Sequence, residues 1–146
     1  MPQAQFYLIQ EAAPENDELS LVENKACDLA TSYFRAGKKV LLWCENKEQA
    51  ERLDDALWQR DGNAFVPHNL AGEITKIPTP VELAWAGKRN SQRRDVIINL
   101  SVQVPEFINS FNHAIDFVPL DEAEKVLARE RYKYYRQLGW QLKMEQ

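Results

Sequence analysis

The sequence predicts an α/β protein: one domain with an open, mainly parallel sheet and helices on both faces, Rossmann-like but lacking a phosphate-binding loop. Strand-like and helix-like segments alternate along the 146 residues, which is typical of parallel sheets. Several strand-like segments are continuous apolar runs, as expected where helices cover both faces of a sheet. The length and the 45% of hydrophobic residues suit a single domain over residues 1–146 with its own core.

The amino-terminal part predicts a strand followed by a helix. Gln5–Ile9 is short and apolar, which indicates a buried strand. Asp17 is placed to cap a helix that ends before Gly37, a residue suited to the turn after a helix. The apolar residues of this helix recur at helical spacing: Leu19, Val22, Ala26, Leu29, Ala30 and Tyr33.

A second strand and a second helix follow. Lys39–Cys44 contains a continuous apolar run, and Asn46 with Gln49 matches a capping box at the start of the helix. Trp58 closes this helix and lies off its inward stripe, which is Ala50, Leu53 and Leu57. A tryptophan in that position is either covered by the following loop or exposed as an interface anchor.

The remainder predicts further strands and two helices. Residues 61–80 are irregular apart from a short strand at Phe65–Val66. Strands are expected at Val81–Trp85, Asp95–Leu100 and Ala114–Val118, with a short helix opened by Pro105 that carries Phe107 and Phe111. Asp121 and Glu124 cap a last helix that reaches Leu138 and ends at Gly139.

The last helix has two contrasting stripes. Ala123, Leu127, Tyr134 and Leu138 form one stripe, which is expected to face the sheet. The opposite stripe holds Lys125, Arg129, Tyr132 and Arg136, with Lys133 at its edge. This line of cations around an aromatic is either a solvated helix face or a docking site for an acidic, partly apolar ligand.

The residues that nucleotide-binding and hydrolytic enzymes need are not arranged for catalysis. The first strand–helix loop has no glycine, and Glu11 and Glu15 would repel phosphate. There is no GxSxG motif. His68 is expected to be a hydrogen-bonding residue in a loop, and His113 a residue at the core edge or in a turn. Cys44 is expected to be a buried structural thiol. The sequence therefore predicts a protein without catalytic residues, metal or cofactor.

Charge and composition argue against general nucleic-acid-binding, secreted and membrane-spanning proteins. A net charge of −4 argues against a surface that binds phosphate backbone throughout, although Lys88, Arg89, Arg93 and Arg94 form a local basic cluster. The start of the chain does not resemble a signal peptide, and no apolar run approaches about 20 residues. Two cysteines do not form a disulfide framework, so a reducing cytoplasm is expected.

Segments spread over nearly the whole chain carry information together: Asp55–Trp58, Phe65–Glu73, Lys88–Arg89 with Arg93–Asp95, Asp116–Pro119, and Leu127–Lys133 with Tyr135–Arg136. Together they resemble the chi subunit of bacterial DNA polymerase III holoenzyme. No single short motif carries this resemblance.

The resemblance implies a non-enzymatic subunit with two partners. Chi subunits pair with the psi subunit, which tethers them to the clamp loader. They also bind the acidic C-terminal tail of single-stranded DNA-binding protein, which ends in aspartate, proline and phenylalanine. Transferred to this chain, Lys125 and Arg129 would meet the tail carboxylates, with Lys133 as a supporting cation. Tyr132 and Val118 would line the pocket for the terminal phenylalanine. Trp58 would extend this apolar surface.

The sequence suggests a site for the psi contact and allows two alternative functions. The resemblance suggests a psi-binding patch at Phe65, Val66 and Pro67, with Phe65 belonging alternatively to the tail site. One rival is a degenerate nucleotide-binding enzyme, which the glycine-free first loop opposes. The other is a direct single-stranded DNA-binding module that uses the Lys88–Arg94 cluster and Trp58.

Overall fold

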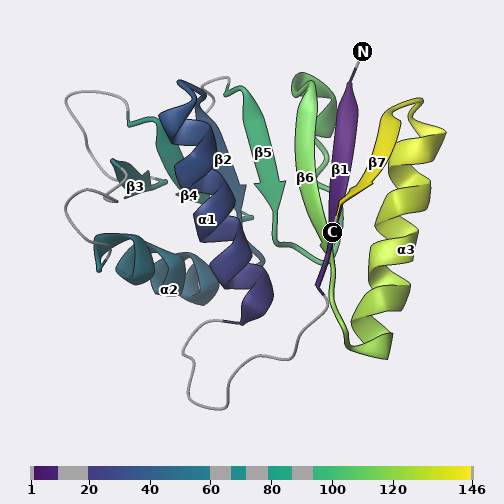
Figure 1. The fold of residues 1–146 in the computed structure, drawn as a ribbon, viewed down its shortest axis with the longest axis horizontal. Coiled ribbons are helices and arrows are strands. Elements are labelled where there is room, and N and C mark those ends of the chain that lie inside the picture. Colours follow the sequence, from purple (N-terminus) through teal and green to yellow (C-terminus); the bar gives the residue numbers. More distant parts are fainter. Residues whose placement is uncertain (1, 10–19, 60–66, 72–78, 87–93, 146) are drawn as a thin grey trace.

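A computed structural model describes residues 2–9, 20–59, 67–71, 79–86 and 94–145. Within these residues the chain forms one sheet of seven strands, three α-helices and one short 3₁₀ helix (Figure 1). The strands are β1 (Gln3–Leu8), β2 (Val40–Trp43), β3 (His68–Leu70), β4 (Val81–Ala84), β5 (Val96–Asn99), β6 (His113–Val118) and β7 (Gln141–Glu145). The helices are α1 (Leu21–Arg35), α2 (Lys47–Trp58), η1 (Ile108–Ser110) and α3 (Glu122–Gln137).

The sheet is open and every strand pair in it is parallel. The strand order is β3-β4-β2-β5-β6-β1-β7, so β3 and β7 are the two edges. This confirms the predicted fold class. A parallel order requires a crossover between neighbouring strands, and the helices supply most of these crossovers.

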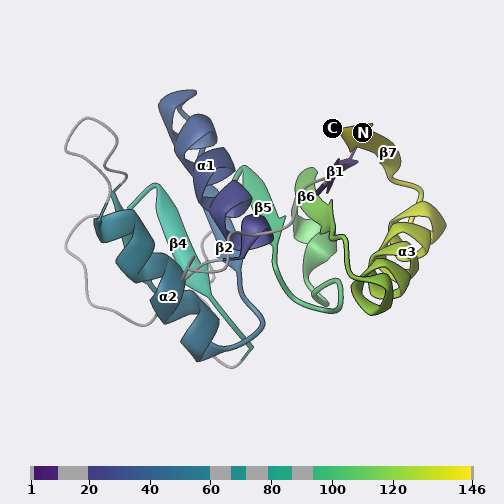
Figure 2. The same ribbon diagram turned by 60° about the horizontal axis from the view of Figure 1, so that its bottom comes forward.

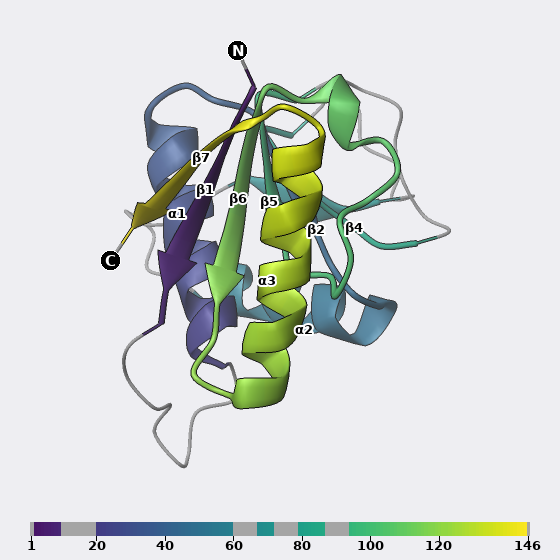
Figure 3. The same cartoon turned by 90° about the vertical axis from the view of Figure 1, so that its right-hand side faces the viewer.

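The two faces of the sheet carry different helices. Helices α1 and α2 pack on one face, and α3 and η1 pack on the other, as Figure 3 shows from the α3 side. Side chains alternate along β2 accordingly: Val40 and Leu42 enter the α1–α2 core, whereas Leu41 and Trp43 enter the α3 core. Figure 2 shows α2 and α3 at opposite ends of the molecule.

Three sequence predictions about the helices change in the structure. The N-cap of α1 is Ser20, whose hydroxyl accepts a hydrogen bond from Glu23 N, so the prediction of Asp17 as the cap is wrong. The buried face of α3 is shifted by about one residue from the predicted face. Ala128 and Tyr135 are buried, whereas Leu127 and Tyr134, which were predicted to face the sheet, are exposed. Tyr132 is consequently half-buried and does not lie on a fully exposed stripe.

The chain also forms a strand that the sequence did not predict. Beyond Gly139 the backbone reverses, Trp140 packs on Tyr135 with ring centroids 5.2 Å apart, and β7 pairs with β1. The predicted strand at Phe65–Val66 lies outside the described residues. Among the residues that are described, no helix is both long and apolar enough to cross a membrane.

The reversal after α3 depends on Gly139, and we expect a backbone penalty there. Gly139 has φ +84°, and a Cβ atom built on it meets nothing within 4 Å. Replacement by alanine should therefore cost only the left-handed backbone conformation, about 1–2 kcal/mol of unfolding free energy. Urea unfolding followed by circular dichroism measures this loss. Gly139→Asn is the matched control and should lose less, because asparagine tolerates this conformation. Equal losses in the two variants would contradict the explanation.

Candidate functional site

Helix α3 and the end of β6 bring most of the predicted tail-binding residues together. Tyr132 packs edge-on against Phe6 of β1, with ring centroids 5.4 Å apart. Val118, the last residue of β6, packs on the same core cluster as Tyr132. Lys125, Arg129 and Lys133 follow one another at four-residue spacing along α3, and Arg129 lies one turn before Tyr132 on the helix surface. We call this set the α3 basic surface: Val118, Lys125, Arg129, Tyr132 and Lys133.

The cations of the α3 basic surface differ in solvent exposure and in ion pairing. Arg129 and Lys133 are exposed, whereas Lys125 is half-buried. Lys125 Nζ lies 3.4 Å from the Glu122 carboxylate, and Lys133 Nζ lies 3.6 Å from that of Glu130. Exposed pairs of this kind contribute little energy, so either lysine can exchange its partner for an incoming carboxylate at low cost.

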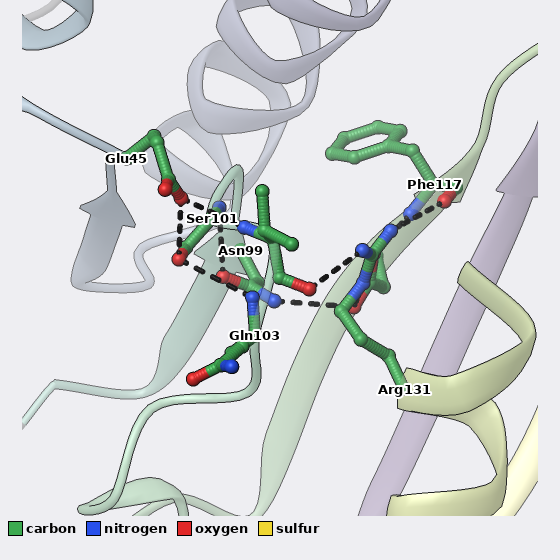
Figure 4. Close-up of polar contacts among 8 residues, drawn as sticks. Glu45, Asn99, Ser101, Gln103, Phe117 and Arg131 are labelled. Carbon is green, nitrogen blue, oxygen red and sulfur yellow. Dashed lines mark hydrogen bonds and ion pairs between the residues drawn. The ribbon is translucent and has the colours of Figure 1, made fainter. Parts of the chain in front are cut away.

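A buried ion pair fixes α3 against β6 next to this surface (Figure 4). Arg131 Nε donates to both carboxylate oxygens of Asp116, at 3.1 and 3.0 Å. Its Nη atoms donate to the backbone carbonyls of Val102 and Phe117, at 3.0 and 3.3 Å. The Asp116 side chain is 1% exposed and that of Arg131 is 10% exposed. The guanidinium thereby joins the helix, the strand and the segment that follows β5.

The polar network continues beyond the ion pair to the end of β2. Asn99 Nδ2 donates to Asp116, and Asn99 Oδ1 accepts from Ser101 N at 3.0 Å. The Glu45 carboxylate accepts from the Ser101 hydroxyl and from Val102 N, both at 2.8 Å (Figure 4). Polar groups in or just after three strands, β2, β5 and β6, are thus satisfied by one another.

Burial dominates the electrostatics of Asp116. Desolvation raises the pKa of its carboxyl above the ordinary range. The adjacent Arg131 cation, and hydrogen bonds from Phe117 N, Arg131 and Asn99, oppose that rise. Asp116 and Arg131 were not singled out in the sequence, although an aspartate inside the apolar stretch 114–118 is a detectable signal. Such a residue in a buried strand requires a partner.

Trp58 lies far from the α3 basic surface. It ends α2 and its ring stands 5.2 Å from that of His68 in β3, which is one edge of the sheet, whereas α3 packs near the opposite edge. The structure therefore does not join Trp58 to Lys125, Arg129 and Tyr132, contrary to the expectation from the resemblance. The Trp58 side chain is 61% exposed, so the interpretation that the following loop covers it is wrong.

The surroundings of Trp58 form a second surface. His68 is buried in a strand and not in a loop as predicted, and its Nε2 atom lies 3.1 Å from Asp54 Oδ1. Pro67 is half-buried immediately before it. We call Trp58, Pro67 and His68 the Trp58 patch. Phe65 and Val66, the other residues predicted to bind psi, lie outside the described residues.

The basic cluster Lys88–Arg94 is only partly described, and its described member is not a surface cation. Arg94 is 5% exposed, pairs with Glu82 at 3.2 Å and donates to the carbonyls of Thr79 and Pro80. Arg94 is therefore neither part of a solvated turn nor a surface cation that the rival function of direct DNA binding could use. Lys88, Arg89 and Arg93 lie outside the described residues.

The remaining candidate groups have structural environments. Cys27 and Cys44 are buried, and burial raises the pKa of the Cys44 thiol far above its ordinary value. His113 begins β6 beside Gln5 and Tyr33, and burial lowers its pKa. Within the part of the chain that the structure describes, no three His, Cys, Asp or Glu residues are grouped to hold a metal ion.

Comparisons with known proteins agree over almost the full chain. Residues 1–143 match the family described as DNA polymerase III chi subunit, HolC. The chain is 56% identical to the DNA polymerase III subunit chi of Haemophilus influenzae, and the match covers 97% of this chain and 95% of that protein. It is 48% identical to the subunit of the same name in Escherichia coli, covering 97% and 96% of the two chains. For the Pseudomonas aeruginosa subunit the identity is 34%, with 97% and 94% covered.

A solved structure shares the fold alone. The crystal structure of T4 UvsW superposes with a TM-score of 0.63 at 9% sequence identity. The match covers 99% of this chain but 40% of that one, so this chain spans less than half of the UvsW structure.

Breaking the buried ion pair should destabilise the protein strongly. Arg131→Met leaves Asp116 buried without its cation, and we expect a loss of about 3–5 kcal/mol in unfolding free energy near neutral pH. Chemical denaturation measures it. Arg129→Met, an exposed cation two residues away, is the matched control and should change stability by less than about 0.5 kcal/mol. The double variant Asp116→Leu/Arg131→Met should regain much of the loss, because no buried charge remains.

The same variant should show a characteristic pH dependence. An aspartate whose folded pKa is raised loses stability as pH rises from its unfolded pKa, about 3.9, through its folded value. Removing Arg131 raises the folded pKa further, so the deficit of Arg131→Met relative to the parent protein should grow with pH and shrink in acid. A deficit that is constant between pH 4 and 8 would contradict this assignment.

Proposed function

The chain belongs to the family of DNA polymerase III chi subunits, an accessory subunit of that polymerase, and from this premise we propose that it docks the C-terminal tail of single-stranded DNA-binding protein on the α3 basic surface. The observation that carries the proposal is the position of Tyr132, half-buried on Phe6 with exposed Arg129 one helical turn away. An aromatic held against the core beside a free guanidinium suits a ligand that is apolar at one end and anionic at the other.

The chemistry of the tail fits this surface residue by residue. Arg129 can form charge-assisted, bidentate hydrogen bonds to the aspartate or to the terminal carboxylate. Lys125 and Lys133, one turn away on either side, add positive charge to both ends of the contact. Tyr132 and Val118 offer apolar area to the terminal phenylalanine, with Phe6 supporting the tyrosine ring from below.

The ion pair beside the surface supports a preformed site. Arg131 and Tyr132 are consecutive, and Arg131 is held by four hydrogen bonds to Asp116, Val102 and Phe117. A helix fixed at this point keeps the Tyr132 ring on Phe6 before any ligand arrives. Preorganisation of this kind reduces the ordering cost of binding.

The proposed role is tethering without catalysis. We expect a micromolar single-site affinity, about −8 kcal/mol, which falls as salt increases because the charges lie near the surface. Many copies of the tail on one coated strand would raise the effective concentration of the polymerase assembly there. This role places the protein in the cytoplasm, at the replication machinery.

We further propose that the Trp58 patch belongs to the contact with psi, which would connect chi to the clamp loader. Trp58 is a large exposed aromatic at the sheet edge opposite to α3, so a partner seated there leaves the α3 basic surface open. Pro67 adds neighbouring apolar area. Aromatic anchors of this type dominate protein–protein interfaces.

Fluorescence polarisation with a labelled acidic peptide that ends in Asp-Ile-Pro-Phe tests the tail site. We expect saturable binding that Arg129→Ala weakens at least tenfold, because a charge-assisted hydrogen bond is lost. Arg35→Ala, an exposed arginine in the last turn of α1 on the other face of the sheet, is the matched control and should change the affinity less than threefold. Removing the terminal phenylalanine from the peptide should also abolish binding. Equal effects of the two arginine variants would refute the site.

Trp58→Ala separates the two surfaces. Size-exclusion chromatography of this variant with psi should show loss of the heterodimer, because the exposed anchor is gone. The same variant should bind the acidic peptide with unchanged affinity, since Trp58 lies at the other edge of the sheet. Val126→Ala, an exposed apolar residue on α3, is the control that should leave the heterodimer intact. Loss of peptide binding in Trp58→Ala with an intact heterodimer would reverse the assignment.

A further inference from the structure

A crevice of about 370 Å³ opens at the carboxyl edge of the sheet, between the N-terminal ends of α1 and α3. The chain that leaves β1 leads to α1 on one face, and the chain that leaves the neighbouring β6 leads to α3 on the other face. Such a divergence is where open parallel sheets hold their ligands. The α3 basic surface lies on the other flank of α3, so this crevice is a separate feature.

The crevice forms because the pairing of β5 with β6 ends before the carboxyl ends of these strands. Their pairing covers only Ile97 and Ile98 on β5, whereas β1 and β6 pair over six residues. Beyond that point the side chains of Asn99 and Asp116 bridge the strands, with Asn99 Nδ2 3.2 Å from Asp116 Oδ2. Both residues line the crevice.

The mouth of the crevice is apolar and exposed. Val102 and Leu120 are each 42% exposed and Leu127 is 39% exposed, and all three line the crevice. They come from the segment after β5, the segment after β6 and helix α3, so three separate parts of the chain place apolar side chains at one opening. Exposed apolar groups gathered at a cavity are typical of a binding site.

The charges of the crevice are predominantly negative. Its lining includes Glu23, Asp116, Asp121 and Glu124, and the one cation among the described lining residues, Arg131, is paired with Asp116. Glu23 is paired with Arg52 at 2.9 Å, whereas Asp121 and Glu124 form no ion pair within the described part of the chain. Low-dielectric walls focus the field of such charges.

Carboxylates already cap the N-terminal ends of both helices. Glu23 closes a capping box with Ser20 on α1, and Asp121 accepts a hydrogen bond from Glu124 N on α3. The backbone donors and helix dipoles that would attract a phosphate are thus offset by carboxylates. The crevice occupies the position of a nucleotide site, but its charge repels nucleotides.

We propose that this crevice binds a basic segment of a protein partner, with an apolar side chain inserted among Val102, Leu120 and Leu127 and an adjacent lysine or arginine facing Asp121 and Glu124. Charge complementarity selects this occupant over a nucleotide or an acidic peptide. The opposite sign of the α3 basic surface means that the two ligands do not compete. The proposal stands independently of the tail-docking function.

The test uses the full chain and a labelled model peptide, acetyl-Lys-Leu-Lys-Leu-Lys-amide, in fluorescence polarisation. We expect saturable binding that Leu127→Gln weakens at least fivefold. Val126→Gln is the matched control: it is the adjacent, similarly exposed residue of α3 but does not line the crevice, and it should change the affinity less than twofold. The peptide acetyl-Glu-Leu-Glu-Leu-Glu-amide should bind at least tenfold more weakly, and ATP should not displace the basic peptide.

A competition experiment distinguishes this site from the tail site. Saturating acidic tail peptide should leave the affinity for the basic peptide within twofold, and Arg129→Ala should do the same. Absence of saturable binding overturns the proposal. Equal loss in Leu127→Gln and Val126→Gln, equal binding of the basic and acidic peptides, or displacement by ATP overturns it as well. None of these outcomes depends on whether the tail peptide itself binds.

Discussion

The placement of helix α3 depends on one buried ion pair. Asp116 lies on the α3 face of the interior strand β6, and Arg131 is the helix residue that reaches it. An unpaired carboxylate in this position would be costly, so the helix must present a cation at this level of the sheet. That requirement sets the rotation of α3 about its axis. Ala128 and Tyr135 consequently face the sheet, and Leu127 and Tyr134 do not.

The rotation of α3 in turn separates its two flanks chemically. With Ala128 against the sheet, Lys125, Arg129 and Tyr132 fall on the flank toward β1, where Phe6 receives the tyrosine. Glu124 and Leu127 fall on the flank toward β5, where they line the crevice. If α3 were rotated about its axis by one residue, Tyr134 would face the sheet and Tyr132 would no longer contact Phe6. The ion pair that stabilises the fold therefore also determines the α3 basic surface and the lining of the crevice.

The sequence predicts the sheet well and the helix faces less well, for a physical reason. Mainly apolar runs such as Val40–Trp43 and Val96–Asn99 are continuous and local signals, and the positive φ of Gly37 and Gly139 follows from residue type. The face of α3 was mispredicted because a hydrophobic stripe counts Arg131 as polar, while tertiary pairing makes it an inward residue. Strand β7 was missed because an edge strand with exposed side chains lacks a strong apolar pattern. The separation of Trp58 from α3 follows from strand order, which spacing along the chain does not contain.

A common fold here carries an altered electrostatic pattern, and that pattern limits its function more than the fold does. Parallel sheets with helices on both faces usually present free helix N-termini at the carboxyl edge, which favours phosphate. In this chain the Glu23 and Asp121 carboxylates cap the two helices by accepting hydrogen bonds from Ser20 N and Glu124 N. Glu45, just after β2, accepts from the Ser101 hydroxyl and from Val102 N. The described cations that remain exposed on α3 are displaced to its flank toward β1 and to its C-terminal end, where the dipole favours them. The acidic residues in the first turn of α3 and Arg136 in its last turn stabilise the helix through its dipole. The same first-turn carboxylates disfavour a nucleotide at the N-terminal end, whereas the proposed tail site uses other cations further along the helix.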